Sequence, residues 1–178
     1  ATVKVEGVDP LSIAEMFGYT GDAFTSGRPA SAAFSVAATE RSGLLSTSLS
    51  LSGVTGSIKV ADQDVAVNNL AFDASYDPAS KKVTLKSLDL DSGWLTGRFT
   101  GEMDATAIMK GEAAPTPFML SGQNVTLNAQ PVFENPWQFE QATLQGALSI
   151  DDQRLTLTRL DAVTGGLKAS GSGDVWLD

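Results

Sequence analysis

Residues 82–101 read KVTLKSLDLDSGWLTGRFTG, and residues 154–173 read RLTLTRLDAVTGGLKASGSG. The two stretches align without a gap at an offset of 72 residues. Each copy alternates apolar and polar residues, turns at a glycine and then alternates again, which predicts a strand, a corner and a second strand. A recurring unit of this kind predicts a modular β architecture. The recurring pairs are Val83 and Leu155, Leu85 and Leu157, Leu88 and Leu160, Asp89 and Asp161, Gly93 and Gly165, Leu95 and Leu167, and Gly101 and Gly173.

Period-two alternation also covers much of the remaining chain, notably residues 45–51, 70–76, 94–103 and 142–150. The opposite positions hold mostly small or polar residues, so the sequence predicts antiparallel strands with one apolar face. The turn at Asp77-Pro-Ala-Ser separates two of them. Four further prolines indicate edge-like or looped segments: Pro115, Pro117, Pro131 and Pro136.

One short N-terminal helix is expected, with Asp9 as its cap and Pro10 in its first position, continuing through Leu11–Phe17 to Gly18. A weaker helical pattern covers residues 39–46, where Gly43 interrupts it. The chain of 178 residues is long enough for one domain with a sizeable core, so residues 1–178 are taken as a single domain. Both ends look like strands, which leads us to expect a fragment of a longer protein.

The amino-acid composition excludes several classes of function. The formal net charge is −9 and the 12 basic residues are scattered, so nucleic acid is not an expected partner. The chain has no cysteine and no histidine, which excludes thiolate or imidazole metal sites and the usual nucleophile–histidine pairs. We therefore expect a protein that is not an enzyme, with no catalytic residues, no cofactor and no metal.

The repeated phrase and the N-terminal part resemble the AsmA-like superfamily of Gram-negative envelope proteins, which includes AsmA, TamB and YhdP. The resemblance is carried by KVTLKSLDL after the Asp-Pro turn, by VDPLSIAEMFG at residues 8–18 and by VAVNNLAFDASYDP at residues 65–78. It covers most of residues 1–104 and about 140–175, whereas 105–139 match poorly. It implies an elongated, strongly curved antiparallel sheet, folded into a taco-like groove or a flattened open barrel.

The same resemblance implies a periplasmic protein, anchored to the inner membrane in its full-length form. Family members are linked to phospholipid movement between the inner and outer membranes, and TamB also to outer-membrane protein assembly. The implied partners are a phospholipid or another acyl-chain lipid, together with inner- or outer-membrane proteins. The family supplies no catalytic residues.

A curved sheet with one apolar face either leaves an open groove or fills its interior with its own side chains, and the sequence leaves both interpretations open. Large residues next to Gly97, Gly101, Gly171 and Gly173 would leave room for an acyl chain. The candidate groove residues are Leu49, Leu51, Val65, Val67, Phe72, Val83, Leu85, Leu95, Phe99, Met103, Leu144, Leu148, Ile150, Leu155, Leu157 and Leu167.

Two other functions remain as alternatives. One is a scaffold for outer-membrane proteins that works by strand addition at exposed sheet edges. The other is a β-sandwich that binds carbohydrate through Trp94, Trp137 and Trp176, although packing is the favoured role of these rings. The acidic pairs Asp62 and Asp64, and Asp151 and Asp152, are expected to be solvated turns rather than Ca²⁺ ligands. Asp89 and Asp161 are expected to accept backbone N–H groups at a corner.

Overall fold

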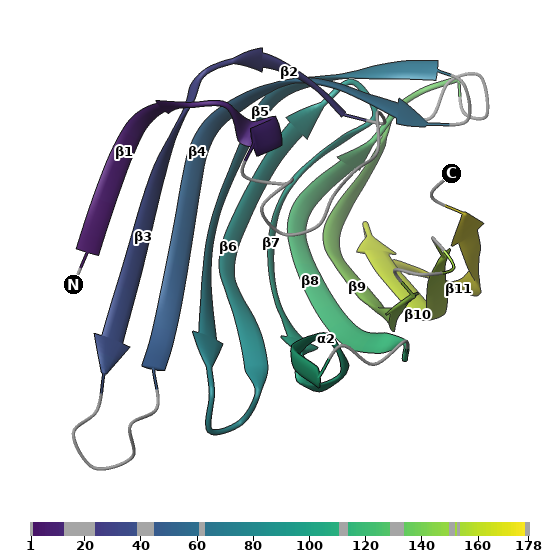
Figure 1. Ribbon diagram of the computed structural model, residues 1–178. Helices are drawn as coiled ribbons and strands as arrows, with labels where there is room; N and C mark the ends of the chain where they lie inside the picture. Colours follow the sequence, from purple (N-terminus) through teal and green to yellow (C-terminus); the bar gives the residue numbers. More distant parts are fainter. Residues whose placement is uncertain are drawn as a thin grey trace.

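The computed structural model describes residues 2–12, 24–38, 45–60, 63–110, 114–128, 134–149, 152 and 154–176. These residues form one open antiparallel sheet of eleven strands and very little helix (Figure 1). The strands are β1 (Thr2–Val8), β2 (Phe24–Arg28), β3 (Ala30–Ala38), β4 (Leu45–Val60), β5 (Gln63–Asp77), β6 (Lys82–Ser92), β7 (Leu95–Asp104), β8 (Thr116–Leu127), β9 (Trp137–Ser149), β10 (Arg154–Thr164) and β11 (Leu167–Trp176).

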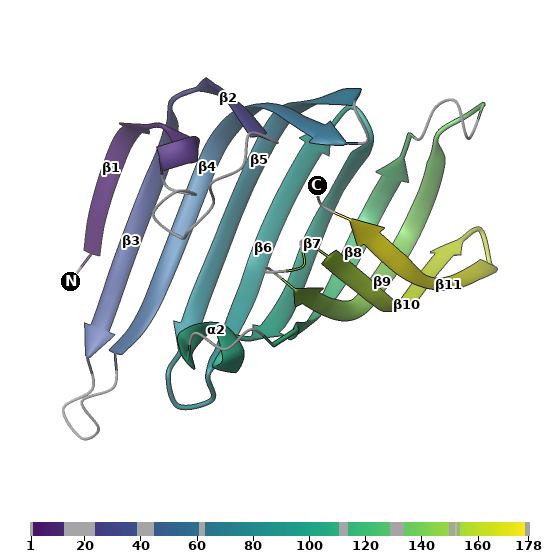
Figure 2. The same ribbon diagram turned by 45° about the vertical axis from the view of Figure 1, so that its right-hand side comes forward.

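The strand order follows the chain from β1 and β3 through β4 to β11, and every described pair is antiparallel. β2 and β3 both pair with β4, and Pro29 lies between them in the chain. The sheet bends along its width, so that β10 and β11 turn out of the plane of β3 to β6 (Figures 1 and 2). β1 and β11 stand at opposite ends of the order and do not pair. The expected curved, open antiparallel sheet is therefore confirmed.

The sequence repeat is a structural repeat. The bounds of β6 and β7 recur in β10 and β11 at the same offset of 72 residues. The cross-strand register recurs as well, because Leu85 faces Gly101 in the first hairpin and Leu157 faces Gly173 in the second. Both hairpins also have a register shift at the same place, directly after these leucines. The chain thus builds the same hairpin twice.

These register shifts keep apolar residues on one face. A β-bulge adds one residue to a strand, so the apolar spacing across it is three rather than two. In β6 the bulge lies between Leu85 and Leu88, and in β10 between Leu157 and Leu160. Without the extra residue, Leu88 and Leu160 would point to the opposite face.

Little of the chain is helical in the described residues. Residues 10–12 are helical, and the Leu11 N–H donates to Asp9 Oδ1 at 3.0 Å, which confirms the expected cap. The rest of that predicted helix lies outside the described residues. So do residues 39–44 of the second predicted helix, whereas Leu45 and Ser46 begin β4, where a helix was wrongly expected. The short helix α2 (Thr106–Lys110) was not predicted, and Asp104 Oδ1 accepts the Thr106 N–H at its start.

The predicted edge-like or looped position is wrong for Pro117, whereas Pro115 and Pro136 lie outside the strands as expected and Pro131 lies outside the described residues. Residues 116–127 form β8, which has a neighbouring strand on each side and is neither an edge nor a loop. Pro117 is tolerated because the described pairing with β7 begins only at Phe118, so the missing N–H of the proline is not needed there. The turn at Asp77 forms as expected. Asp77 accepts the Ala79 N–H at 3.0 Å and the Ser80 hydroxyl at 2.8 Å.

Candidate functional site

One face of the sheet is apolar from end to end. In a first row of cross-strand neighbours, every strand of the main order contributes an apolar residue or a glycine; in a second row, every strand again contributes one. The first row consists of Val3, Phe34, Leu49, Ala74, Leu85, Gly101, Leu120, Leu144, Leu160 and Gly171. The second row consists of Val5, Ala32, Leu51, Phe72, Leu88, Phe99, Gly122, Ala142, Ala162 and Ala169. We call the face that carries both rows the apolar face.

Nearly all the sequence-predicted groove residues lie on the apolar face. Leu49, Leu51, Phe72, Leu85, Phe99 and Leu144 belong to the two rows, and the remaining described candidates share their side of the sheet by register. Ile150 lies outside the described residues. Other members of this face were not predicted as groove residues, among them Phe34, Leu88, Leu120 and Leu160. Strict two-residue alternation cannot place Leu88 and Leu160, since a bulge precedes each of them.

The centre of the apolar face is packed by its own side chains. Phe99 is only 5% exposed, and it packs with Val125, Ala142 and Leu88. Leu51 and Val54 form a second buried cluster with Ala30. All the buried apolar side chains of the described strands lie on this face, as expected for the inner side of a bend, where side chains converge.

Some of the expected room beside glycines is filled. A Cβ at Gly122 would lie 2.7 Å from atoms of Phe99 and Val125, and one at Gly97 would lie 3.2 Å from the same two side chains. A Cβ at Gly101 would clash with the β8 backbone and Leu120. The expectation of room beside Gly97 and Gly101 was therefore wrong. It holds for Gly171 and Gly173, where a Cβ would have no heavy atom within 4 Å.

Towards both ends of the strand order the apolar face is accessible. Phe34 of β3 is 44% exposed, Leu160 of β10 is 37% exposed, and Leu167 of β11 is 73% exposed. No second sheet lies over this face among the described residues. The total accessible surface is 11460 Å² for 18.6 kDa. A compact monomer of that mass exposes only about 8,200 Å². The excess is what a single curved layer should show.

The opposite face is polar and ion-paired. Lys82 Nζ lies 3.0 Å from Glu102 Oε1, and Arg98 Nε lies 2.7 Å from Asp89 Oδ1. Asp161 accepts a hydrogen bond from Arg159 Nε. Asp89 and Asp161 thus bind arginine side chains rather than the corner N–H groups that were expected. The pairs are exposed, so each contributes little stability.

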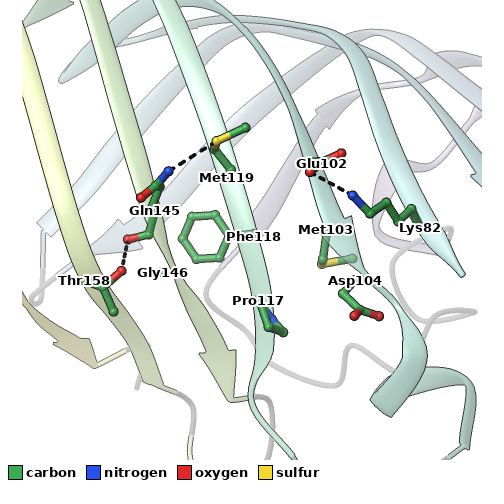
Figure 3. Close-up of a pocket in the computed structure, with 10 residues that line it drawn as sticks. All are labelled: Lys82, Glu102, Met103, Asp104, Pro117, Phe118, Met119, Gln145, Gly146 and Thr158. Carbon is green, nitrogen blue, oxygen red and sulfur yellow. Dashed lines mark hydrogen bonds and ion pairs between the residues drawn. The ribbon is translucent and has the colours of Figure 1, made fainter. Parts of the chain in front are cut away.

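A depression of about 340 Å³ opens on the polar face over β7, β8 and β9 (Figure 3). Its polar groups bind one another: Gln145 Nε2 lies 3.4 Å from Met119 Sδ, and Thr158 Oγ1 donates to the Gln145 carbonyl at 3.1 Å. Asp104 also lines it, and hydrogen bonds from the side chain and backbone N–H of Thr106 hold the pKa of Asp104 below its usual value. These polar groups of the depression are thus held by bonds within the protein.

The three tryptophans do not share a surface. Trp137 faces Leu127 and so lies on the apolar face, where its ring packs edge-on against Phe139 at 6.1 Å between centroids. Trp176 pairs with Arg154 on the polar face, with the Arg154 guanidinium 5.3 Å from its ring centroid. Trp94 lies in the corner between β6 and β7. Trp137 and Trp176 therefore cannot form one platform for a sugar.

No group of three acidic side chains in the described part of the chain is placed to hold a metal ion. Asp62 and Asp151 lie outside that part. Within the same residues, no helix has the length and apolarity that crossing a bilayer requires.

Comparisons with protein-family models, curated proteins and solved structures give no match to this chain. The resemblance to AsmA-like proteins stays a prediction from the sequence.

Proposed function

We propose that the apolar face shields lipid acyl chains from water, as part of a periplasmic protein that moves phospholipid between the inner and outer membranes. The observation that carries the proposal is the apolar face, which continues across every strand of the main order and is exposed at Phe34, Leu160 and Leu167. Soluble monomers rarely leave a continuous apolar surface uncovered unless something binds there.

The energetics favour an acyl chain. Each CH₂ moved out of water contributes about 0.8 kcal/mol, so one long chain gains roughly 10 kcal/mol before the costs of binding. No polar contact is needed, which agrees with the apolar content of both rows. Because the first row crosses successive strands and none of its members is buried, an acyl chain lying along that row meets an accessible apolar surface at each step. Such a surface suits movement along the sheet.

A matched pair of variants tests the proposal. Leu160 on the apolar face and Met119 on the polar face are both 37% exposed. The delipidated chain is incubated with a phospholipid that carries a pyrenyl acyl chain, and retained lipid is measured after gel filtration. We expect Leu160→Asp to lower retention by about fivefold or more, because an acyl chain lying there would remove water from the carboxylate without replacing its hydrogen bonds. Met119→Asp should retain lipid like the wild type.

Each outcome is decisive once circular dichroism shows that both variants keep the wild-type fold. Equal retention by the two variants would place the lipid away from the apolar face and overturn the proposal. So would a wild-type chain that retains no lipid above the level of a control protein.

A further inference from the structure

β11 occupies the structural position of β7 but lacks the neighbour that β7 has. β7 pairs with β6 on one side and with β8 on the other. β11 pairs with β10 in the same register, and no described strand pairs with its other edge. The second hairpin therefore presents an edge that, in the first hairpin, is covered by β8.

The side chains differ where the neighbour is missing. Phe99 of β7 lies opposite Gly122 of β8, and its ring fills the space above that glycine. Gly171 holds the equivalent place in β11 and leaves that space empty. A strand added beside β11 would thus meet a glycine where β8 meets a phenylalanine. In the first hairpin the large residue is on β7 and the glycine is on β8. A bulky residue in the strand added beside β11 would form a similar pair, with the glycine on β11 and the large residue on the added strand.

The β11 edge has less protection against strand pairing than the β1 edge. Edge strands are commonly blunted by prolines, bulges, charged side chains or short length, and of these β11 has two charged side chains, Lys168 and Asp174. β1, at the other end, has only seven residues and is interrupted at Gly7, whose φ is +71°. β11 has ten residues and no proline, and the carboxylate of Asp174 is held by Arg154 and Thr156. Its outer backbone groups are free to form a new ladder within the described structure.

We propose that the outer edge of β11 accepts an antiparallel β-strand whose side chains follow the pattern of β8, with a bulky apolar residue opposite Gly171. The occupant is an extended segment that alternates apolar and polar residues, not a folded surface. Main-chain hydrogen bonds supply affinity and the residue opposite Gly171 supplies selectivity. The added strand extends both apolar rows by one position.

Two labelled peptides test the proposal against two chains. One peptide has the sequence of residues 116–127, and the other has the same sequence with Gly122→Phe. The chains are the wild type and Gly171→Phe, a substitution for which the structure leaves room. We expect the wild type to prefer the phenylalanine peptide by about tenfold, which corresponds to about 1.4 kcal/mol. Gly171→Phe should abolish or reverse the preference, because the new ring would itself fill the space over peptide residue 122, as the Phe99 ring does over Gly122.

Fluorescence anisotropy of the peptides gives the affinities, and the unfolding midpoint shows that Gly171→Phe remains folded. Absence of saturable binding to the wild type would overturn the proposal, and so would a preference that ignores residue 171. A concentration-dependent dimer that crosslinks through cysteines placed at Ser172 would overturn it as well, because the occupant would then be a second copy of the chain.

Discussion

Phe99 and Gly171 hold equivalent positions in the two hairpins, each opposite a leucine, yet one is at the centre of a packed cluster and the other lies beside empty space. The difference lies in their outer neighbours, since β8 covers β7 and no described strand covers β11. The apolar face is therefore partly a core and partly an accessible surface. The two interpretations left open by the sequence apply to different parts of one sheet.

Alanine substitutions at Gly122, where the neighbouring space is filled, and at Gly171, where it is empty, should change the stability of the fold in different ways. Gly122→Ala should destabilise the chain by about 1–3 kcal/mol, because its Cβ would press on Phe99 and Val125. Gly171→Ala should be neutral or stabilise by about 0.5 kcal/mol, because alanine loses less entropy than glycine in a strand. Urea unfolding monitored by circular dichroism measures both. Equal effects would mean that the two glycines have similar surroundings.

Two phenylalanines on the apolar face should differ in how much their side chains stabilise the fold. Phe99→Ala should cost about 3 kcal/mol or more, because the side chain is 5% exposed and its loss leaves a cavity. Phe34→Ala should cost less, about 1 kcal/mol, because that residue is already 44% exposed. The unfolding free energies check this order. A larger cost at Phe34 would show that something outside the described residues covers it.

The two hairpin corners should differ in their need for glycine. Gly93 and Gly165 are equivalent in the repeat, but only Gly165 has a left-handed backbone, with φ +52°. Gly165→Ala should destabilise by about 1–2 kcal/mol through backbone strain. Gly93→Ala should have little effect, since its Cβ would meet only Val65 at an ordinary distance of 3.9 Å. Thermal melts of the two variants give the comparison.

The turn at Asp77 should become less stabilising in acid. Hydrogen bonds from the Ser80 hydroxyl and then from the Ala79 N–H hold the pKa of Asp77 below its usual value of 3.8. A lowered pKa in the folded state means that the carboxylate stabilises the fold at neutral pH. This contribution is lost as pH falls below 3.8 and through the folded-state pKa. The stability gap between the wild type and Asp77→Ala should therefore narrow in that range. A gap independent of pH would contradict it.

Tryptophan fluorescence should report on which side lipid lies. Variants that keep only Trp137 or only Trp176 place the reporter on the apolar or the polar face, respectively. Phospholipids with brominated acyl chains should quench the Trp137 variant and leave the Trp176 variant nearly unchanged, because quenching needs contact. Both variants must first show the wild-type circular dichroism spectrum. Equal quenching would place acyl chains on both faces.

Several features of the fold could be predicted from local patterns. Alternation predicted most strands and their apolar face, and the repeat predicted both hairpins. The Asp77 turn followed from its own residues. β8 escaped prediction because Pro117 and the three-residue step from Gly122 to Val125 both break the expected pattern. The proline was tolerable only because of where the pairing with β7 begins, which is a property of a neighbour and not of the segment.

The sequence by itself determined that the chain forms strands with one apolar face and builds the same hairpin twice. This is because side-chain direction in a strand depends on residue spacing, which is local. Only the tertiary structure decided that Phe99 fills the space above Gly122 while Gly171 stays open. That outcome depends on which strand lies beside each glycine. The physical reason is that the burial of a residue depends on the side chains of the adjacent strands. A local sequence pattern does not specify which strand lies beside it.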